Sequence, residues 1–233
     1  MRVFDLEPSR VLAVYAHPDD AEVSCGGALA RWAAMGADVH VLVVARGDKG
    51  STDPAANPDA LADQRAVETE TAGAVLGVSA HHWLGRPDGE VIDDPALRSD
   101  LVGVIRDVRP DVVVAPDPTA VFFGERYVNH PDHRAVGWAA LAAVPHAAGN
   151  PHYHPECGPP WSATTFLLSG TLEPDGWVDI SGHIDAKVAA LACHTSQLGE
   201  AGEWLRSVVV MRAEEAGRAA GVTHAESFRQ LLL

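Results

Sequence analysis

An apolar run turns abruptly polar within residues 11–20, VLAVYAHPDD. A short apolar run that ends at a turn signal is typical of a buried strand, so we expect a strand over Val11–Ala16. An imidazole and two adjacent carboxylates follow this strand at once. A second apolar run, over residues 112–115, precedes a second polar cluster at residues 129–133, NHPDH. Two such clusters at strand ends are typical of a metal site that several loops of one sheet build together.

Strand-like and helix-like segments alternate along nearly the whole chain. The expected strands cover residues 11–16, 39–45, 81–84, 111–115 and 164–168. The expected helices cover residues 21–35, 60–76, 95–108, 133–144, 184–198 and 203–217. This alternation predicts an α/β fold with a mostly parallel central sheet and helices on both faces. No internal repeat or low-complexity linker divides the sequence, so we expect a single domain over residues 1–233.

Composition narrows the class of protein. The 233 residues include 17 Lys and Arg against 32 Asp and Glu, which gives a formal charge of −15. Nucleic acids and anionic membranes reward basic surfaces, so neither is an expected partner. The three cysteines form no CxxC pair, and no apolar run reaches the length of a membrane-spanning helix. We therefore expect a reduced, cytoplasmic protein that acts on a small molecule, with a homo-oligomer left open.

Three residues of the two clusters carry the side chains of a catalytic zinc site. His17, Asp20 and His133 offer two imidazoles and one carboxylate, which leaves a coordination position open for water. Asp19 then stays free to take a proton from that water, because Pro18 fixes the chain and lets neighbouring side chains point in different directions. The plainer alternative is that these carboxylates only cap the helix that follows.

The second cluster offers two further roles. His130 and His133 are three residues apart, a spacing that lets one bind metal while the other faces the substrate. As a charged imidazole, His130 is expected to steady an oxyanion and to protonate a leaving amine. Asp132 is expected to orient an imidazole. The alternative is a polar loop that simply leads into a helix.

Taken together, these motifs resemble the PIG-L/LmbE-like family of zinc-dependent N-deacetylases. The resemblance rests on HPDDAE at residues 17–22, followed by Gly26-Gly27, and on HPDH at residues 130–133. Further similarities lie at Arg65-Ala66-Val67-Glu68, Leu76-Gly77-Val78, Asp88-Gly89, Lys187 with His194-Thr195-Ser196-Gln197, and Ala225-Glu226-Ser227-Phe228. They extend over most of the chain.

The resemblance implies a Rossmann-like three-layer fold and hydrolysis of an N-acyl group, usually acetyl on an amino sugar. It implies Zn²⁺ as the cofactor, with other divalent metals possible, and a small N-acylated amino-sugar derivative as the substrate. An amidase of the mycothiol-conjugate type is the alternative within the family.

The resemblance also assigns residues to roles. It implies metal binding by His17, Asp20 and His133, with Asp19 as general base and His130 as general acid or oxyanion stabiliser. Arg65 and Asp88 occupy positions where relatives contact the sugar, although a helix salt bridge and a turn are the alternatives for these two residues. The chain departs from some deacetylases by carrying Val128, with Tyr127 beside it, where they have a tyrosine.

Two hypotheses outside the family stay open. Two histidines and one carboxylate also describe the facial triad of Fe(II) oxygenases, although that triad is usually His-x-Asp/Glu on a β-barrel strand. The other is a metal-binding protein without catalysis. Asp19 beside the ligands argues against it, because a structural metal site has no use for a spare base.

Overall fold

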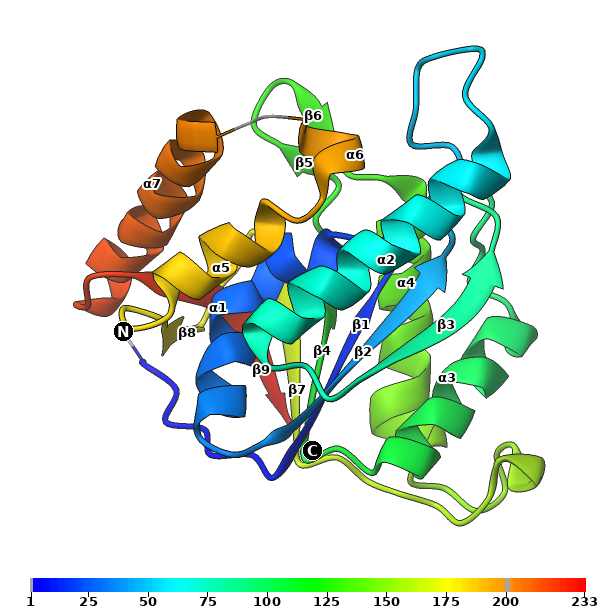
Figure 1. The fold of residues 1–233 in the computed structure, drawn as a ribbon. Helices are drawn as coiled ribbons and strands as arrows, with labels where there is room; N and C mark the ends of the chain where they lie inside the picture. Colours follow the sequence, from blue (N-terminus) through cyan, green and yellow to red (C-terminus); the bar gives the residue numbers. More distant parts are fainter. Residues whose placement is uncertain (1, 200–201) are drawn as a thin grey trace.

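Strand β1 (Arg10–Tyr15) lies inside a seven-stranded sheet with the order β3-β2-β1-β4-β7-β9-β8. The structure is a computed structural model that describes residues 2–199 and 202–233 (Figure 1). The other strands of this sheet are β2 (Asp38–Ala45), β3 (Ala80–Arg86), β4 (Val112–Pro116), β7 (Thr165–Ser169), β8 (Gly176–Asp179) and β9 (Ala225–Leu232). A separate two-stranded hairpin joins β5 (Phe122–Phe123) to β6 (Tyr127–Val128).

The sheet is mostly parallel, as the alternation predicted. Strands β3, β2, β1, β4 and β7 pair in parallel, and all five expected strands are present. Strand β9 pairs antiparallel with both β7 and β8. The sequence did not predict β8 or β9, and β9 inserts between β7 and β8, so the C-terminal segment completes the sheet.

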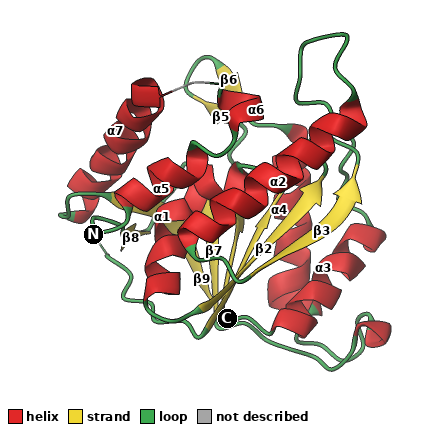
Figure 2. Cartoon of the chain, in the orientation of Figure 1, coloured by secondary structure: helices red, strands yellow, loops and turns green. Residues whose placement is uncertain are grey.

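Helices cover both faces of the sheet (Figures 1 and 2). One face carries α1 (Asp20–Ala34), α2 (Pro58–Leu76), α5 (Ile184–Leu191) and α7 (Gly202–Ala220). The other face carries α3 (Pro95–Val108) and α4 (Pro131–Ala142). Strand β1 shows why its sequence has no polar alternation: its odd-numbered residues 11, 13 and 15 join one core and its even-numbered residues 12 and 14 join the other. The predicted three-layer α/β fold is confirmed.

The prediction of one helix over residues 184–198 is wrong. Helix α5 ends at Leu191, and a separate short helix, α6 (Thr195–Leu198), follows after a turn. The Glu68 carboxylate on α2 accepts hydrogen bonds from Thr195 Oγ1 at 2.8 Å and from the Ser196 N–H at 2.8 Å. This tertiary contact holds α6 against α2, and the local sequence does not predict it.

The carboxyl ends of the parallel strands place four loops at one edge of the sheet. The loop after β1 carries residues 17–19, and the loop after β2 carries Gly47 and Asp48. The loop after β3 carries Asp88, and the segment after β4 leads through the β5–β6 hairpin to His130. Among the described residues, no helix combines the length and apolarity that crossing a membrane requires.

Candidate metal centre

The two histidine motifs meet because β1 and β4 are neighbours. Val11 to Ala13 of β1 lie in parallel register with Val112 to Val114 of β4, so the loops that follow both strands leave the same edge of the sheet. The rings of His17 and His133 are 5.2 Å apart between centroids. His133 reaches this position from the first turn of α4, which begins at Pro131. The predicted adjacency of the two clusters is therefore confirmed.

Three atoms with free lone pairs converge at this point. His17 Nδ1 lies 3.2 Å from His133 Nε2, and His133 Nε2 lies 3.2 Å from Asp20 Oδ1. The other oxygen of Asp20, Oδ2, lies 3.5 Å from His17 Nδ1. Two ligand atoms of a tetrahedral zinc site, each about 2.0–2.1 Å from the ion, are roughly 3.3–3.4 Å apart. The three side chains thus have the spacing of a ligand set.

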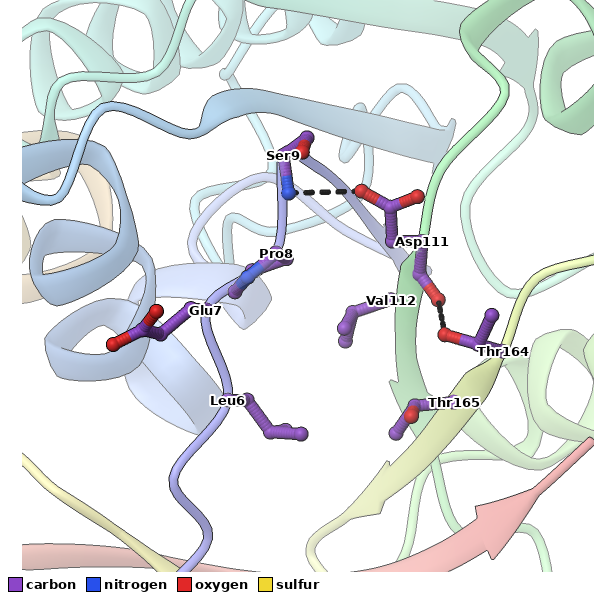
Figure 3. Close-up of a pocket in the computed structure, with 8 residues that line it drawn as sticks. All are labelled: Leu6, Glu7, Pro8, Ser9, Asp111, Val112, Thr164 and Thr165. Carbon is purple, nitrogen blue, oxygen red and sulfur yellow. Dashed lines mark hydrogen bonds between the residues drawn. The ribbon is translucent and has the colours of Figure 1, made fainter.

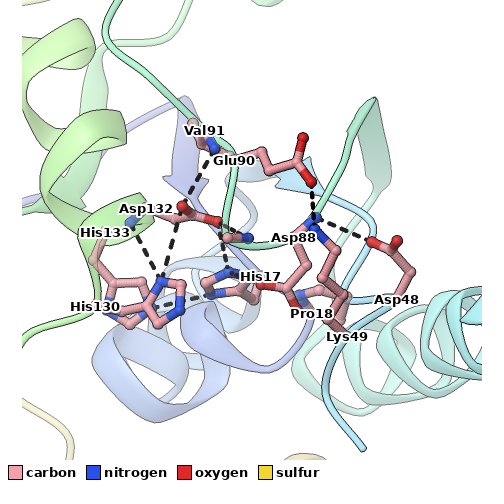
Figure 4. A network of polar contacts seen from close by, with 12 residues as sticks. His17, Pro18, Asp48, Lys49, Asp88, Glu90, Val91, His130, Asp132 and His133 are labelled. Atoms are coloured by element: carbon pink, nitrogen blue, oxygen red, sulfur yellow. Dashed lines mark hydrogen bonds and ion pairs between the residues drawn. The ribbon is translucent and has the colours of Figure 1, made fainter.

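The opposite nitrogen of each imidazole contacts an oxygen of the protein, and Figure 4 shows His17 beside Asp132 and Asp88. His133 Nδ1 lies 3.1 Å from Asn129 Oδ1. His17 Nε2 lies 3.1 Å from Asp132 Oδ2 and 3.0 Å from Asp88 Oδ1. A ring nitrogen that donates to an oxygen leaves the other nitrogen unprotonated and available to a cation. The sequence predicted such an orienting role for Asp132, but it gave no signal for Asn129.

Two other sets of candidate ligands surround the same imidazole. They are His17 with His130 and His133, and His17 with Asp88 and Asp132. In the second set, Asp132 is fully buried, and its two oxygens already accept the N–H groups of Gly89 at 2.8 Å and Val91 at 3.3 Å. These bonds favour an orienting role for Asp132. The set that contains Asp20 combines His17 Nδ1 and His133 Nε2 with Asp20 Oδ1, whereas Asp20 Oδ2 accepts the His17 backbone N–H at 2.8 Å.

In the absence of a metal, the cluster attracts a proton. Burial disfavours the charged imidazole of His17, but hydrogen bonds to Asp132, Asp20 and Asp88 outweigh burial and raise its pKa to about 12. The surrounding carboxylates therefore stabilise positive charge at the point where the ligand atoms converge. A metal ion has to displace that proton, so binding is coupled to pH.

Asp19 stands beside the ligands without being one of them. It occupies the position before α1 with φ 92° and ψ −23°, and its side chain makes no capping hydrogen bond. The Asp19 side chain therefore does not cap the helix, whereas Asp20 lies in the first turn of α1, where the helix dipole favours a carboxylate. A non-glycine residue in this left-handed conformation is strained, and such strain concentrates at functional sites. Burial first, and then the neighbouring charge of Asp20, raise the pKa of Asp19 to about 7.

Arg65 holds the loop that carries Asp19. Its buried guanidinium donates to the carbonyl oxygens of Pro18 at 2.7 Å and Gly47 at 3.1 Å, and it lies 3.3 Å from Asp19 Oδ2. A side chain at Gly47 would collide with this guanidinium, because a Cβ there would lie 2.5 Å from Arg65 Nη1. The helix salt bridge that was the alternative for Arg65 is not seen among the described residues: its ion-pair partner is Asp19, and Glu68 binds α6. The donors of Arg65 are directed at the chain itself.

His130 lies next to the cluster and is partly open to solvent. Its side chain is 39% exposed, and its ring stands edge-on to His17 with centroids 4.7 Å apart. The backbone N–H of Asp132 donates to His130 Nδ1 at 3.2 Å, so the neutral ring carries its proton on Nε2. Burial and the charge of His17 lower the pKa of His130. The sequence predicted a charged imidazole, whereas these contacts favour the neutral form.

The nearby tyrosine does not enter the cluster. Tyr127 is 53% exposed and packs against Phe123 in the β5–β6 hairpin, with ring centroids 5.9 Å apart. Val128 is 59% exposed. The hairpin joins the centre through Asn129, whose amide donates to the Ala120 carbonyl at 2.8 Å.

A hollow of about 260 Å³ lies at the opposite edge of the sheet, before the starts of β1, β4 and β7 (Figure 3). Its carboxylate Asp111 accepts the backbone N–H groups of Ser9 at 2.8 Å and Arg10 at 3.0 Å. That carboxylate therefore serves to join two strand starts. The candidate ligands His17, Asp20 and His133 lie at the other edge of the sheet.

Known proteins are similar to this chain in sequence and in fold. Residues 12–144 match the PIG-L family, described as GlcNAc-PI de-N-acetylase. The chain is 30% identical to a 1D-myo-inositol 2-acetamido-2-deoxy-alpha-D-glucopyranoside deacetylase of Kineococcus radiotolerans, over 82% of this chain and 70% of the relative. It is 33% identical to a diacetylchitobiose deacetylase of Thermococcus kodakarensis, over 82% of this chain and 71% of the relative. The solved N,N'-diacetylchitobiose deacetylase of Pyrococcus horikoshii superposes with a TM-score of 0.88 at 30% identity, over 97% of this chain and 85% of that chain.

Proposed function

This chain belongs to the PIG-L family, and from that membership we propose that it is a metal-dependent hydrolase that removes an N-acetyl group from an amino sugar. The observation that carries the proposal is the convergence of His17 Nδ1, His133 Nε2 and the Asp20 carboxylate at 3.2–3.5 Å, with Asp19 beside them and outside this set. The relatives that share the sequence are named as deacetylases of acetylated amino sugars.

We propose that His17, Asp20 and His133 hold the metal and that Zn²⁺ is the ion. The donor set, two imidazoles and one carboxylate, suits zinc and leaves an open position. A divalent ion held by these residues would polarise the amide carbonyl and would lower the pKa of a water molecule toward about 7. Asn129 and Asp132 fix the two imidazoles through their other nitrogens, which keeps the lone pairs aimed at one point.

Asp19 is the proposed general base. Its carboxylate accepts one proton from the attacking water as the water oxygen bonds to the amide carbon. The same proton then passes to the amide nitrogen as the C–N bond breaks, and the second water proton stays on the acetyl product. The products are acetic acid and an amine, which ionise to acetate and an ammonium group at neutral pH. In the metal-free protein, burial and then the charge of Asp20 raise the pKa of Asp19 above that of an exposed aspartate, so its carboxylate is the stronger base.

His130 is the proposed partner of the developing oxyanion. Since its Nδ1 accepts the Asp132 N–H, its Nε2–H is the group free to donate to a substrate oxygen. A neutral imidazole can stabilise an oxyanion by hydrogen bonding without giving up its proton. In this scheme Asp19 supplies the proton to the leaving amine, and His130 keeps its own.

We propose that Arg65 and Asp88 position other residues of the site. Arg65 positions the 17–19 loop through its bonds to Pro18 and Gly47. Asp88 lies 3.0 Å from His17 Nε2 and shares the orientation of that ring with Asp132. Both residues thus act on the reacting groups indirectly, by positioning the 17–19 loop and the His17 ring. Contact of either residue with the sugar stays a prediction.

The charges around the centre favour an amino sugar without an anionic substituent. Asp48 accepts the N–H of Asp88 at 3.0 Å, and the exposed Lys49 is paired with Glu90 at 2.6 Å. The cation of Arg65 is buried and committed to the loop. Carboxylates therefore outnumber cations near the cluster, and a phosphate next to the sugar would meet like charge.

The test is acetate release from N,N'-diacetylchitobiose and from an N-acetylglucosaminyl inositol, with protein first stripped by a chelator and then reloaded with zinc. We expect release that disappears on stripping and returns on reloading. Absence of release from every N-acetylated sugar tried, under every divalent metal, contradicts the proposal. Oxygen consumption that depends on iron would favour the oxygenase alternative instead.

A further inference from the structure

Helix α1, which carries the metal ligand Asp20, is broken near its start. Cys25 has φ −144° and ψ 17°, values outside the helical range, so α1 consists of a first segment over 20–24 and a second segment over 26–34. The first segment begins directly after Asp19. A helix breaks sharply where a side chain enters its hydrogen-bond ladder.

An ion pair from distant parts of the chain occupies this break. Glu226 of β9 accepts the Gly27 N–H at 2.9 Å with one oxygen and the Ala28 N–H at 2.8 Å with the other. Lys187 of α5 donates to the Val23 carbonyl at 2.8 Å and lies 2.5 Å from Glu226 Oε1. In an unbroken helix the Gly27 N–H would bond to the Val23 carbonyl. Here Glu226 accepts the Gly27 N–H and Lys187 donates to the Val23 carbonyl, so both backbone groups have a partner.

The break is enclosed on every side. The Lys187 side chain is 9% exposed and that of Glu226 is 5% exposed. A Cβ on Gly27 would lie 2.6 Å from Ile180, so glycine is needed for this close approach. Tyr15 of β1 donates to Cys25 Sγ at 3.4 Å, which ties the break to the strand that leads to His17. The geometry of the first segment is therefore fixed by groups outside the helix.

We propose that the Glu226–Lys187 pair is a positioning device for the metal centre: it holds α1 in two segments so that the first segment can place Asp20 and Asp19. The inference rests on the proposed function, because it assumes that Asp20 binds metal and Asp19 acts as base. Neither member of the pair touches the reacting groups. Their effect passes through the backbone of residues 23–28.

The test compares Glu226→Gln, Lys187→Met and the double variant. The double variant leaves no single charge buried without its partner, so it is the variant expected to fold even where a single one does not. Three quantities are measured: metal-free unfolding temperature, zinc affinity by chelator competition, and kcat and KM for an N-acetylglucosaminide. Groups that orient metal ligands cost about 10–100-fold in affinity or activity when removed. We expect a loss of that size in zinc affinity and in kcat, with KM nearly unchanged.

Arg106→Met is the matched control. Arg106 is also a buried cation, and its guanidinium donates to backbone carbonyls that include those of Ala148 at 3.0 Å and Asn150 at 2.9 Å. It lies on α3, on the other face of the sheet. Arg106→Met is expected to lower the unfolding temperature while the folded protein keeps its zinc affinity and kcat. A merely structural role for the Glu226–Lys187 pair would give its variants this same pattern, and that result would overturn the proposal.

Hydrogen exchange separates this inference from the proposed function. In metal-free protein, amides of residues 20–24 should exchange faster in the double variant than in the unaltered chain, whereas amides of α4 should not change. If the unaltered chain binds no metal and releases no acetate, the proposed function fails, and the exchange result still decides the positioning role. Equal exchange of residues 20–24 in both proteins overturns that role.

Discussion

Asp19→Asn separates catalysis from metal binding with little change of shape. Asparagine occupies the left-handed backbone region at least as readily as aspartate, so the φ of 92° at this position is no obstacle. The strongest bond that holds the loop, from Arg65 to the Pro18 carbonyl at 2.7 Å, does not involve the Asp19 carboxylate. The three proposed ligands are untouched. The substitution therefore removes one base and one charge.

The expected catalytic loss follows from the role of a general base. A positioned base contributes about 10²–10⁴-fold to a rate, which corresponds to roughly 3–5 kcal/mol of transition-state stabilisation. We expect kcat for acetate release to fall by that factor. KM and zinc affinity should stay within about threefold of the unaltered chain, since the lost interaction belongs to the transition state.

The same substitution should stabilise the metal-free protein. Burial, followed by the charge of Asp20, raises the pKa of Asp19 from 3.8 to about 7. Between these two values the unfolded chain releases the proton while the folded chain retains it, so folding becomes less favourable as pH rises. The cost at pH 7 is at most about 4 kcal/mol, and asparagine escapes it. The gain should vanish below about pH 3, where both states hold the proton.

The assay combines steady-state acetate release with thermal unfolding in chelator at two pH values. Asp132→Asn is the matched comparison, because it removes a carboxylate that contacts His17 and should weaken zinc binding. If Asp19→Asn retains more than about a tenth of kcat, a loss smaller than a positioned base explains, Asp19 is not the base. Loss of zinc by this variant would instead make Asp19 a ligand.

Three further outcomes are expected. Burial opposes the charge on His17, but its hydrogen bonds to Asp132 and other carboxylates raise its pKa to about 12, so zinc binding near neutral pH should release about one proton. Calorimetry in buffers of different ionisation enthalpy measures this, and heats that do not depend on the buffer would refute it. His130→Ala should lower kcat by about 10²–10³-fold without loss of metal; loss of metal in a chelator titration would favour the ligand set that contains His130. N-Acetylglucosamine 1-phosphate should be hydrolysed at least about tenfold less efficiently than a neutral methyl glycoside at low salt. Competition assays should show this gap narrowing as salt screens the carboxylates, and equal use of both compounds would rule out the charge argument.

The parts of the fold that local patterns encode were predictable. Strand β1 has apolar residues at every position because both of its faces are covered, and such runs are visible in a sequence. Strand β9 (AESFRQLL) was missed, since it carries Glu226 and Arg229 and resembles the polar sequence around it. Its place between β7 and β8 depends on pairing with strands formed far earlier in the chain. Hydrophobic period alone could not reveal that pairing.

Some residues of the metal centre could likewise be predicted from the sequence, and others could not. His17, Asp20 and His133 could be proposed because imidazoles and carboxylates after two strands announce metal chemistry. Asn129 could not, because an asparagine in a loop has many uses and its bond to His133 Nδ1 appears only in three dimensions. For Arg65 the sequence indicated a functional residue but not its hydrogen-bond partners. Its bond to the Pro18 carbonyl could not be predicted, because every residue has a backbone carbonyl and the sequence does not show which one an arginine contacts.

The insertion of β9 has a consequence for how the molecule assembles. Gly27 and Glu226 are 199 positions apart, so the contact that completes α1 spans most of the sequence. Contacts of such long range form late and slow the folding of a chain. During synthesis the residues near position 20 leave the ribosome long before their support exists, and a nascent chain would carry the side chains of the centre without the rigid frame that aims them. With the ligands proposed above, metal binding should therefore follow the pairing of β9, and a chain that lacks β9 should bind zinc more weakly than the full chain.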